Sequence, residues 1–248
     1  MSPGAADAAW PALVRRASAS FRPAGRFALH FARGKLRWDP VFHHLLRHGL
    51  IAPGSRVLDI GCGQGLLASL FEAAADRARR GGWPAGWAPP PTGVRLIGIE
   101  LSTRQVARAR DALGDGAEFV CGDMRRVAFP RADTVVILDV LHYIERHEQD
   151  EVLARARTAI GESGSLLLRV GDAGSRRRFA TSQWVDRLVL LLRGCRARPQ
   201  SGRAVSEWIE QLVGLGFQVS CRPMSAGTPF ANVLLVATLG PVCAASTA

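Results

Sequence analysis

The sequence predicts an α/β fold in which a mostly parallel sheet is covered by helices on both faces. Short apolar runs alternate with amphipathic segments between residues 56 and 170, a pattern typical of parallel strands joined by crossover helices. A glycine-rich loop at 61–65 joins the first expected strand to the next helix. The last two expected strands, 217–222 and 232–238, have no helix between them, so they predict an antiparallel hairpin at one edge.

Two helical segments precede the first expected strand. Residues 5–19 are rich in alanine with apolar side chains at helical spacing, and residues 40–50 repeat the pattern and end at a glycine. We expect residues 1–50 to form a helical cap and residues 51–240 to form the α/β domain, packed together as one compact unit. Residues 76–93 are rich in glycine and proline and predict a surface insertion.

The remaining elements follow from hydrophobic periodicity along the chain. Short buried runs predict strands at 56–60, 94–100, 117–121, 132–138 and 165–170. Apolar residues at helical spacing predict helices at 66–75, 103–113, 145–160, 176–194 and 205–215.

The composition is that of a soluble globular protein, with 48% hydrophobic and 21% charged residues. The N-terminus lacks the basic and apolar segments of a signal peptide, and no apolar run approaches the ~20 residues of a membrane-spanning helix. We therefore expect a cytoplasmic protein without a transmembrane segment. Five widely spaced cysteines and the pair His44 and His48, without accompanying carboxylates, argue against disulfides and against a metal site.

The formal net charge of +11 raises the question of nucleic acid binding. Lys35 is the only lysine, and the arginines are scattered along the chain instead of forming one stripe. This distribution favours a solvated basic surface and disfavours a nucleic acid partner. An acidic partner or substrate is the alternative.

The most informative segment is the run VLDIGCGQG at 57–65. Its glycines let the backbone turn sharply and approach a ligand at a helix N-terminus. Asp59 stands just before the glycines Gly61, Gly63 and Gly65, where a carboxylate would repel the pyrophosphate of a dinucleotide. The same carboxylate suits S-adenosylmethionine (SAM), which carries a sulfonium and an ammonium group and no phosphate. The segment therefore favours SAM over NAD.

Two companion segments extend this interpretation. Glu100 ends the second expected strand, where a carboxylate can accept both ribose hydroxyls, and Leu101 can lie beside the adenine. Asp123 follows the third strand and can accept the exocyclic amine of adenine, with Met124 packing on the ring. A structural turn role for Asp123 after Gly122 stays open.

The three segments, in this order, resemble the class I SAM-dependent methyltransferase superfamily over about residues 40–170. The resemblance implies SAM as the cofactor, S-adenosylhomocysteine as its product, and a SAM-dependent methyltransferase domain at residues 51–240. It also implies a Rossmann-like seven-stranded sheet of order 3-2-1-4-5-7-6, with the last strand antiparallel. The number of residues between Asp59 and Glu100 is larger than is usual in this superfamily, and the insertion at 76–93 accounts for the additional residues.

The segment after the fourth strand is where members of this superfamily hold the SAM amino acid and the substrate. Asp139 is the expected cofactor contact there, and His142 and Tyr143 are the candidate catalytic residues. A histidine with a pKa of about 6.5 suits a general base, and packing at a helix start is the somewhat favoured alternative. The motif N-P-P-Y of amino methyltransferases is absent from this segment, which disfavours a base-modifying enzyme.

The stretch 31–39 mixes aromatic and basic residues ahead of the first strand. In similar enzymes a basic residue here pairs with the SAM carboxylate, which implicates Lys35 or Arg33, while an exposed charged loop is the alternative. The expected cofactor residues are thus Lys35, Asp59, Gly61, Gly63, Gly65, Glu100, Leu101, Asp123, Met124 and Asp139.

A narrower resemblance concerns the stretches FARGKLRWDPVF, SQWVDRL and MSAGTPFANVLL. They are similar to bacterial methyltransferases of aryl polyene pigment gene clusters. This resemblance implies transfer to oxygen or carbon of a small hydrophobic, aromatic or carrier-bound acyl substrate, with an acyl carrier protein as partner. The alternatives are an RNA or protein methyltransferase and a non-catalytic SAM-binding module. The sequence leaves a homodimer open.

Overall fold

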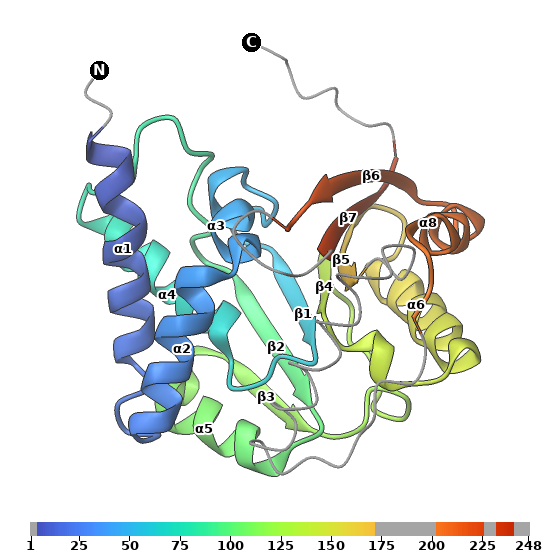
Figure 1. The fold of residues 1–248 in the computed structure, drawn as a ribbon, viewed down its shortest axis with the longest axis horizontal. Helices are drawn as coiled ribbons and strands as arrows, with labels where there is room; N and C mark the ends of the chain where they lie inside the picture. Colours follow the sequence, from blue (N-terminus) through green and yellow to red (C-terminus); the bar gives the residue numbers. More distant parts are fainter. Residues whose placement is uncertain (1–3, 172–201, 226–231, 241–248) are drawn as a thin grey trace. The chain divides into compact units, whose positions relative to one another are not determined.

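The structure is a computed structural model that describes residues 4–171, 202–225 and 232–240, with the side chains of residues 4–8 excepted. The strands form one seven-stranded sheet of order β3-β2-β1-β4-β5-β7-β6 (Figure 1). This order confirms the expected Rossmann-like fold. The strands are β1 (Arg56–Ile60), β2 (Arg95–Glu100), β3 (Glu118–Cys121), β4 (Thr134–Leu138), β5 (Gly164–Gly171), β6 (Gln218–Pro223) and β7 (Asn232–Leu239).

The helices described by the structure agree with most of the expected ranges. They are α1 (Gly4–Ala19), α2 (Arg26–Trp38), α3 (Pro40–Arg47), α4 (Leu66–Arg79), α5 (Thr103–Leu113), α6 (Arg146–Ile160) and α8 (Val205–Gly214), with short 3-10 turns η1 (Gly114–Gly116) and η2 (Leu141–Tyr143). The helix expected at 176–194 lies outside the described residues. No helix in the described ranges is long and apolar enough to cross a membrane.

The chain divides into two compact units, one formed by Met1–Ala128 with Ala226–Thr228 and the other by Phe129–Ser225 with Pro229–Ala248. In the first unit, β1, β2 and β3 are parallel, and their register places Asp59 beside Gly98 and Glu100 beside Cys121. Because the carboxyl ends of parallel strands share one edge of a sheet, the glycine loop and Glu100 come together there.

Helix α3 begins where the local chemistry predicts a helix start. Asp39 is the N-cap residue and accepts a hydrogen bond from the Val41 amide at 3.2 Å, and Pro40 follows at the first helical position. Helix α1 packs against both α2 and α4. The three N-terminal helices therefore belong to the same unit as the glycine loop.

Helix α2 has no counterpart among the expected elements. Its buried stripe consists of Ala28, Ala32 and Leu36, spaced four residues apart, while Phe27 and Trp38 are exposed. Small buried residues and large exposed ones weaken the periodic signal on which a prediction depends. The stretch 31–39 is thus mostly helical, and the alternative of a charged loop is wrong.

The insertion is anchored on α3. The His43 ring lies edge-on between Trp10 and Trp87, with 5.0 Å between ring centres on each side. The Ala88 amide donates to the Arg47 carbonyl at 3.0 Å. Helix α4 also continues to Arg79, so the irregular stretch is shorter than the predicted 76–93.

In the second unit, β4 and β5 are parallel, and β7 runs antiparallel to both β5 and β6. The predicted terminal hairpin is thereby confirmed. Apolar side chains of β4, β5 and β7, such as Ile137, Leu167 and Leu235, are fully buried. Burial on both faces explains why these strands read as continuous apolar runs in the sequence.

Candidate cofactor and active site

The glycine loop of the first unit follows β1 and leads into α4. Gly61, Gly63 and Gly65 have φ angles of 77°, 57° and 80°, in the left-handed region that favours glycine. A Cβ atom at Gly65 would also lie 2.9 Å from Cζ of Phe119. The Gly61 amide donates to the Ile99 carbonyl at 2.8 Å, which anchors the loop to β2. These glycines are thus required by backbone geometry and by close packing.

Glu100 lies directly against this loop. Its Oε2 accepts a hydrogen bond from the Gly63 amide at 3.0 Å, and its Oε1 accepts one from the Ser102 amide at 2.9 Å. Two backbone donors therefore hold the carboxylate at the carboxyl ends of β1 and β2. This is the position expected for a group that accepts ribose hydroxyls.

Asp59 is the buried acid of the loop, with 5% of its surface exposed. Burial and the nearby Glu100 charge raise the pKa of Asp59 to about 7. A cation beside such a buried carboxyl group favours its charged form, so the two charges stabilise each other. The pair Asp59 and Glu100 therefore fits a ligand that carries positive charge and hydroxyl groups.

The expected adenine contacts have different surroundings. Leu101 is 66% exposed at the end of β2, and Met124 is partly buried. Asp123 forms an ion pair with Arg125 at 2.5 Å and accepts the Arg125 amide at 2.9 Å. The Arg125 side chain lowers the pKa of Asp123. Asp123 thus closes a turn, as the structural alternative had it, and its carboxylate is already engaged by a cation.

Lys35 lies on α2 and not on a loop. Its Nζ atom is 2.7 Å from Oδ2 of Asp39, the residue that caps α3. Arg33 is exposed on the same helix. A SAM carboxylate at Lys35 would share the ammonium group with Asp39, so the expected pairing stays a prediction.

Gln64 is a residue that the sequence analysis missed. It is 1% exposed, and its Nε2 donates to the Ala28 carbonyl at 2.9 Å, which ties the glycine loop to α2. The available signal was a polar residue between two glycines of a buried loop. Gln64 thus fixes the position of the glycine loop relative to α2.

In the second unit, Asp139 follows β4 with a φ angle of 59°, the one positive value among non-glycine residues in the described ranges. Its carboxylate pairs with Arg169 on β5 through two hydrogen bonds, one of them from Nε to Oδ1 at 2.8 Å. Arg169 is 2% exposed. Strained backbone at a strand end and a buried ion pair are both typical of functional sites. Arg169 was also missed, although an arginine within the apolar strand SLLLRV is a signal.

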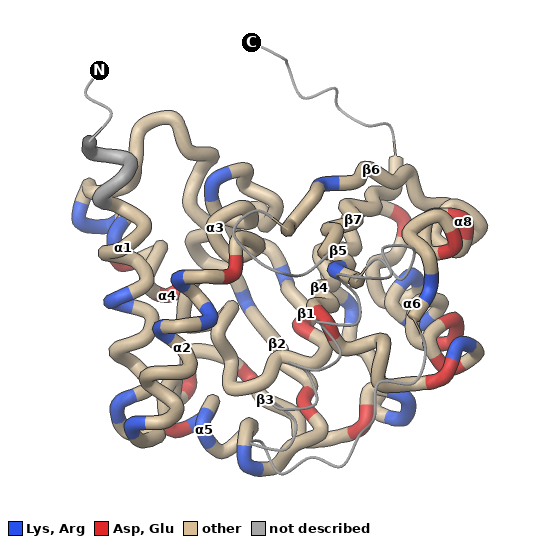
Figure 2. The backbone as a smooth tube through the Cα atoms, in the orientation of Figure 1, with Lys and Arg blue, Asp and Glu red and all other residues tan. Residues whose placement is uncertain are grey.

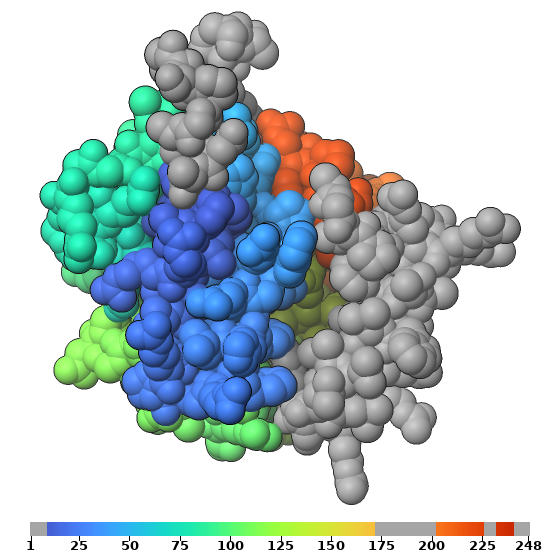
Figure 3. Space-filling model, turned by 60° about the vertical axis from the view of Figure 1, so that its left-hand side comes forward, coloured from blue at the N-terminus to red at the C-terminus, as the bar shows by residue number. Residues whose placement is uncertain are grey.

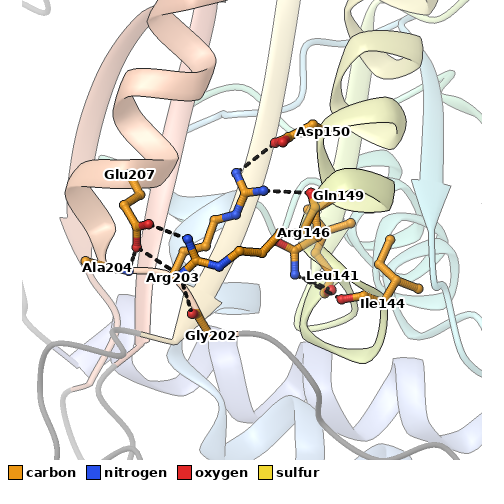
Figure 4. A network of polar contacts seen from close by, with 9 residues as sticks. All are labelled: Leu141, Ile144, Arg146, Gln149, Asp150, Gly202, Arg203, Ala204 and Glu207. Carbon is orange, nitrogen blue, oxygen red and sulfur yellow. Dashed lines mark hydrogen bonds and ion pairs between the residues drawn. The ribbon is translucent and has the colours of Figure 1, made fainter.

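His142 and Tyr143 lie side by side in η2, with 4.0 Å between ring centres. Gln149 of α6 holds this turn from both ends, because its Nε2 donates to the Leu141 and Ile144 carbonyls at 3.0 and 3.2 Å (Figure 4). Gln149 is fully buried. A single side chain therefore fixes the turn that presents both candidate catalytic residues.

The start of α6 is in turn tied to α8. Arg146 forms an ion pair with Glu207 at 2.5 Å, and Arg203 donates to Asp150 and to the Arg146 carbonyl at 2.7 Å each (Figure 4). The Arg203 side chain is 7% exposed. This network rigidifies the helix that carries Gln149.

The expected site residues are thus distributed over two units. Those of the first unit are Lys35, Asp59, Gly61, Gly63, Gly65, Glu100, Leu101, Asp123 and Met124, and those of the second are Asp139, His142 and Tyr143. The glycine loop, Asp59 and Glu100 lie together at the carboxyl ends of β1 and β2, and their role in cofactor binding stays a prediction.

Known proteins resemble part of this sequence. Residues 57–164 match the family model of a methyltransferase domain. The chain is similar to the carboxy-S-adenosyl-L-methionine synthase of Chromohalobacter salexigens, with 31% identity over 130 residues, which are 48% of this chain and 43% of the relative. The chain thus spans less than half the length of that relative.

Two solved structures share the fold. The magnesium protoporphyrin IX methyltransferase of Synechocystis, solved with bound SAH, has a TM-score of 0.57 at 18% identity, covering 95% of this chain and 100% of that one. An O-methyltransferase family protein of Burkholderia thailandensis has a TM-score of 0.61 at 18% identity, covering 89% and 62%. Residues 57–164 thus match a methyltransferase domain, and the chain shares its fold with methyltransferases, one of which was solved with bound SAH.

Proposed function

We propose that the chain transfers the methyl group of SAM to an oxygen or carbon atom of a small hydrophobic acceptor, either aromatic or an acyl group on a carrier protein. The observation that supports SAM use is the pair of carboxylates at the glycine loop, with Glu100 held by the Gly63 amide and Asp59 buried with a raised pKa. SAM supplies a methyl group on a positively charged sulfur. Asp59 stabilises that kind of charge, and Glu100 is placed to accept hydroxyl donors.

The proposed positioning and deprotonation of the methyl acceptor depend on His142 and Tyr143 of η2. Methyl transfer is an in-line displacement, so an acceptor hydroxyl must be oriented and must lose its proton. We assign His142 as the group that takes this proton and Tyr143 as a group that orients the acceptor. Gln149 fixes the turn that carries both, and the pair Asp139 and Arg169 fixes the end of β4 beside it. Asp139 stays a proposed cofactor contact.

The narrower substrate class rests on the resemblance to methyltransferases of aryl polyene clusters. A basic surface, with a net charge of +11, suits an acidic acyl carrier protein. The same charge is the feature that favours an RNA or protein acceptor. A SAM-binding module without catalysis would keep the cofactor half and lack a function for His142.

The test is methyl transfer from radiolabelled SAM to three acceptors. These are 4-hydroxycinnamate, its pantetheine thioester as a carrier mimic, and transfer RNA. The proposal expects label on the thioester or the free phenol, and a decrease of 10²-fold or more in turnover for His142→Gln. Label on RNA alone would contradict the proposed acceptor class, and binding of SAM without transfer to any of the three would favour the non-catalytic module.

A further inference from the structure

Helix α2 carries an exposed face that is not used by its packing against α1. The buried stripe Ala28, Ala32 and Leu36 occupies one side of the helix. A second row, Phe27, Phe31 and Trp38, follows offsets of four and seven residues, so its members share another side. Phe27 is 49% exposed and Trp38 is 70% exposed. The row extends over about 16 Å of helix.

Beside the aromatic row runs a row of basic side chains. Arg26, Arg33 and Arg37 are exposed at offsets of seven and four residues, and His30 is exposed between them. The helix sequence RFALHFARGKLRW contains no aspartate or glutamate, and Figure 2 shows basic and no acidic positions along α2. The aromatic and basic rows are therefore adjacent, parallel and free of acidic residues within the helix.

We propose that this face of α2 docks the protein on the surface of a bilayer that contains anionic lipids. Exposed aromatic rings insert favourably among lipid headgroups, and neighbouring arginines can pair with lipid phosphates. Positive charge on one face attracts an anionic leaflet, so the two rows act together. The face belongs to the surface formed by α1 and α2 (Figure 3). The proposal is independent of the methyl acceptor.

The ring contacts favour a bilayer over a nucleic acid. Phe31 stacks on Phe27 with 6.3 Å between ring centres and an interplanar angle of 10°. The Arg108 guanidinium lies 5.0 Å from the centre of the Phe27 ring, and the Arg37 guanidinium lies 5.1 Å from the centre of the Trp38 ring. A nucleotide base needs an open ring face for stacking, whereas insertion among lipid headgroups uses ring edges and rims.

The outward position of the rows also favours a bilayer over a shaped protein partner. Both rows lie away from the buried stripe Ala28, Ala32 and Leu36 of α2, which packs on α1. A convex row of aromatics requires a concave groove on a protein partner, while a lipid surface deforms around it. The occupant to which the proposal commits is therefore the anionic lipid surface.

The experiment is co-sedimentation of the full chain with vesicles. One vesicle preparation contains phosphatidylglycerol and phosphatidylcholine, and the other contains phosphatidylcholine alone. The wild type is expected to sediment with the anionic vesicles and to be released by added salt. Arg33→Gln combined with Arg37→Gln should lower the partition coefficient on the order of tenfold or more. Phe27→Ser combined with Trp38→Ser should lower it as well, which a purely electrostatic attraction would not show.

The matched control is Arg95→Gln combined with Arg222→Gln, which removes the same charge from exposed positions outside α2. This control should sediment like the wild type. Far-UV circular dichroism verifies that each variant is folded. The proposal is overturned if the wild type stays in the supernatant with anionic vesicles, or if the control loses as much binding as the α2 variants. Binding of single-stranded RNA without binding of vesicles would assign the face to nucleic acid and would equally overturn it.

Discussion

The Gly63 amide donates a hydrogen bond to the Glu100 carboxylate at 3.0 Å, across 37 positions of sequence. This contact joins the glycine loop after β1 to the end of β2. It places a negative charge against a turn whose backbone geometry requires glycine. A phosphate-binding loop would aim the same amide at its ligand. Here the amide is instead engaged by the Glu100 carboxylate.

The raised pKa of Asp59 predicts a pH-dependent stability. Because its folded-state pKa of about 7 exceeds the ordinary value of 3.8, the folded protein binds more protons than the unfolded chain between these values. The contribution is present below about pH 4, and the free energy of unfolding falls as pH rises through 7. Asp59→Asn should remove this slope, which denaturant titration at pH 5 and pH 8 measures. An unchanged slope in Asp59→Asn would contradict the assignment.

Binding of a cation at Asp59 should release a proton. A positive ligand favours the charged carboxylate, so SAM affinity should rise between about pH 6 and pH 8. The neutral-sulfur product S-adenosylhomocysteine should show a weaker rise. Calorimetry in two buffers of different ionisation enthalpy counts the proton released. Equal pH profiles for the two ligands would argue against a contact between Asp59 and the sulfonium charge.

Substitution of Gly65 tests the packing of the loop. Gly65→Ala places an alanine at a φ of 80°, which is strained for any residue with a Cβ atom, and brings that Cβ atom 2.9 Å from Phe119. Gly81→Ala places an alanine at a similarly strained φ of 68°, but with open space around its Cβ atom. Both variants carry the backbone cost of about 1 kcal/mol, and Gly65→Ala should lose about 1–3 kcal/mol more from overpacking. Urea denaturation provides both values. An equal decrease in the free energy of unfolding for both variants would mean that the Phe119 side chain moves aside without an energetic cost.

The ion pair between Asp139 and Arg169 predicts a coupled mutational effect. Asp139→Ala removes the carboxylate from an arginine that is 2% exposed, and the expected loss is about 3 kcal/mol or more. Arg169→Met in the same chain should restore part of the stability, since the buried charge is then gone. A double-mutant cycle measures this coupling, and additive losses would show that the pair is not energetically linked.

Gln149 should affect turnover more than cofactor binding. Gln149→Leu removes two hydrogen bonds to the turn of His142 and Tyr143, so the turn should lose its fixed position. We expect a turnover reduced by roughly tenfold or more with unchanged affinity for S-adenosylhomocysteine. Gln211→Leu on α8 is the matched control. A loss of cofactor affinity equal to the loss of turnover would indicate a general disruption instead.

Much of this fold follows from local pattern, and its exceptions have physical reasons. Strands such as β1 and β4 are buried on both faces, so their apolar runs are visible in the sequence. Helix α2 was not predicted because two of its three buried residues are alanines. Its large aromatic residues Phe27 and Trp38 are exposed, which weakens the periodic signal. The partners of Gln64 and Arg169 are set by tertiary packing, since 36 and 30 positions separate them from Ala28 and Asp139.

The most direct test of cofactor recognition is calorimetric titration with S-adenosylhomocysteine, with NADH as the second ligand. The wild type, Glu100→Ala and the exposed-acid control Glu118→Ala are compared. We predict micromolar binding to the wild type and the control, no binding of NADH, and an affinity about 10–100-fold lower in Glu100→Ala. Binding of NADH in place of S-adenosylhomocysteine, or equal affinity in Glu100→Ala, would contradict the assignment of the glycine loop and Glu100 as the cofactor site.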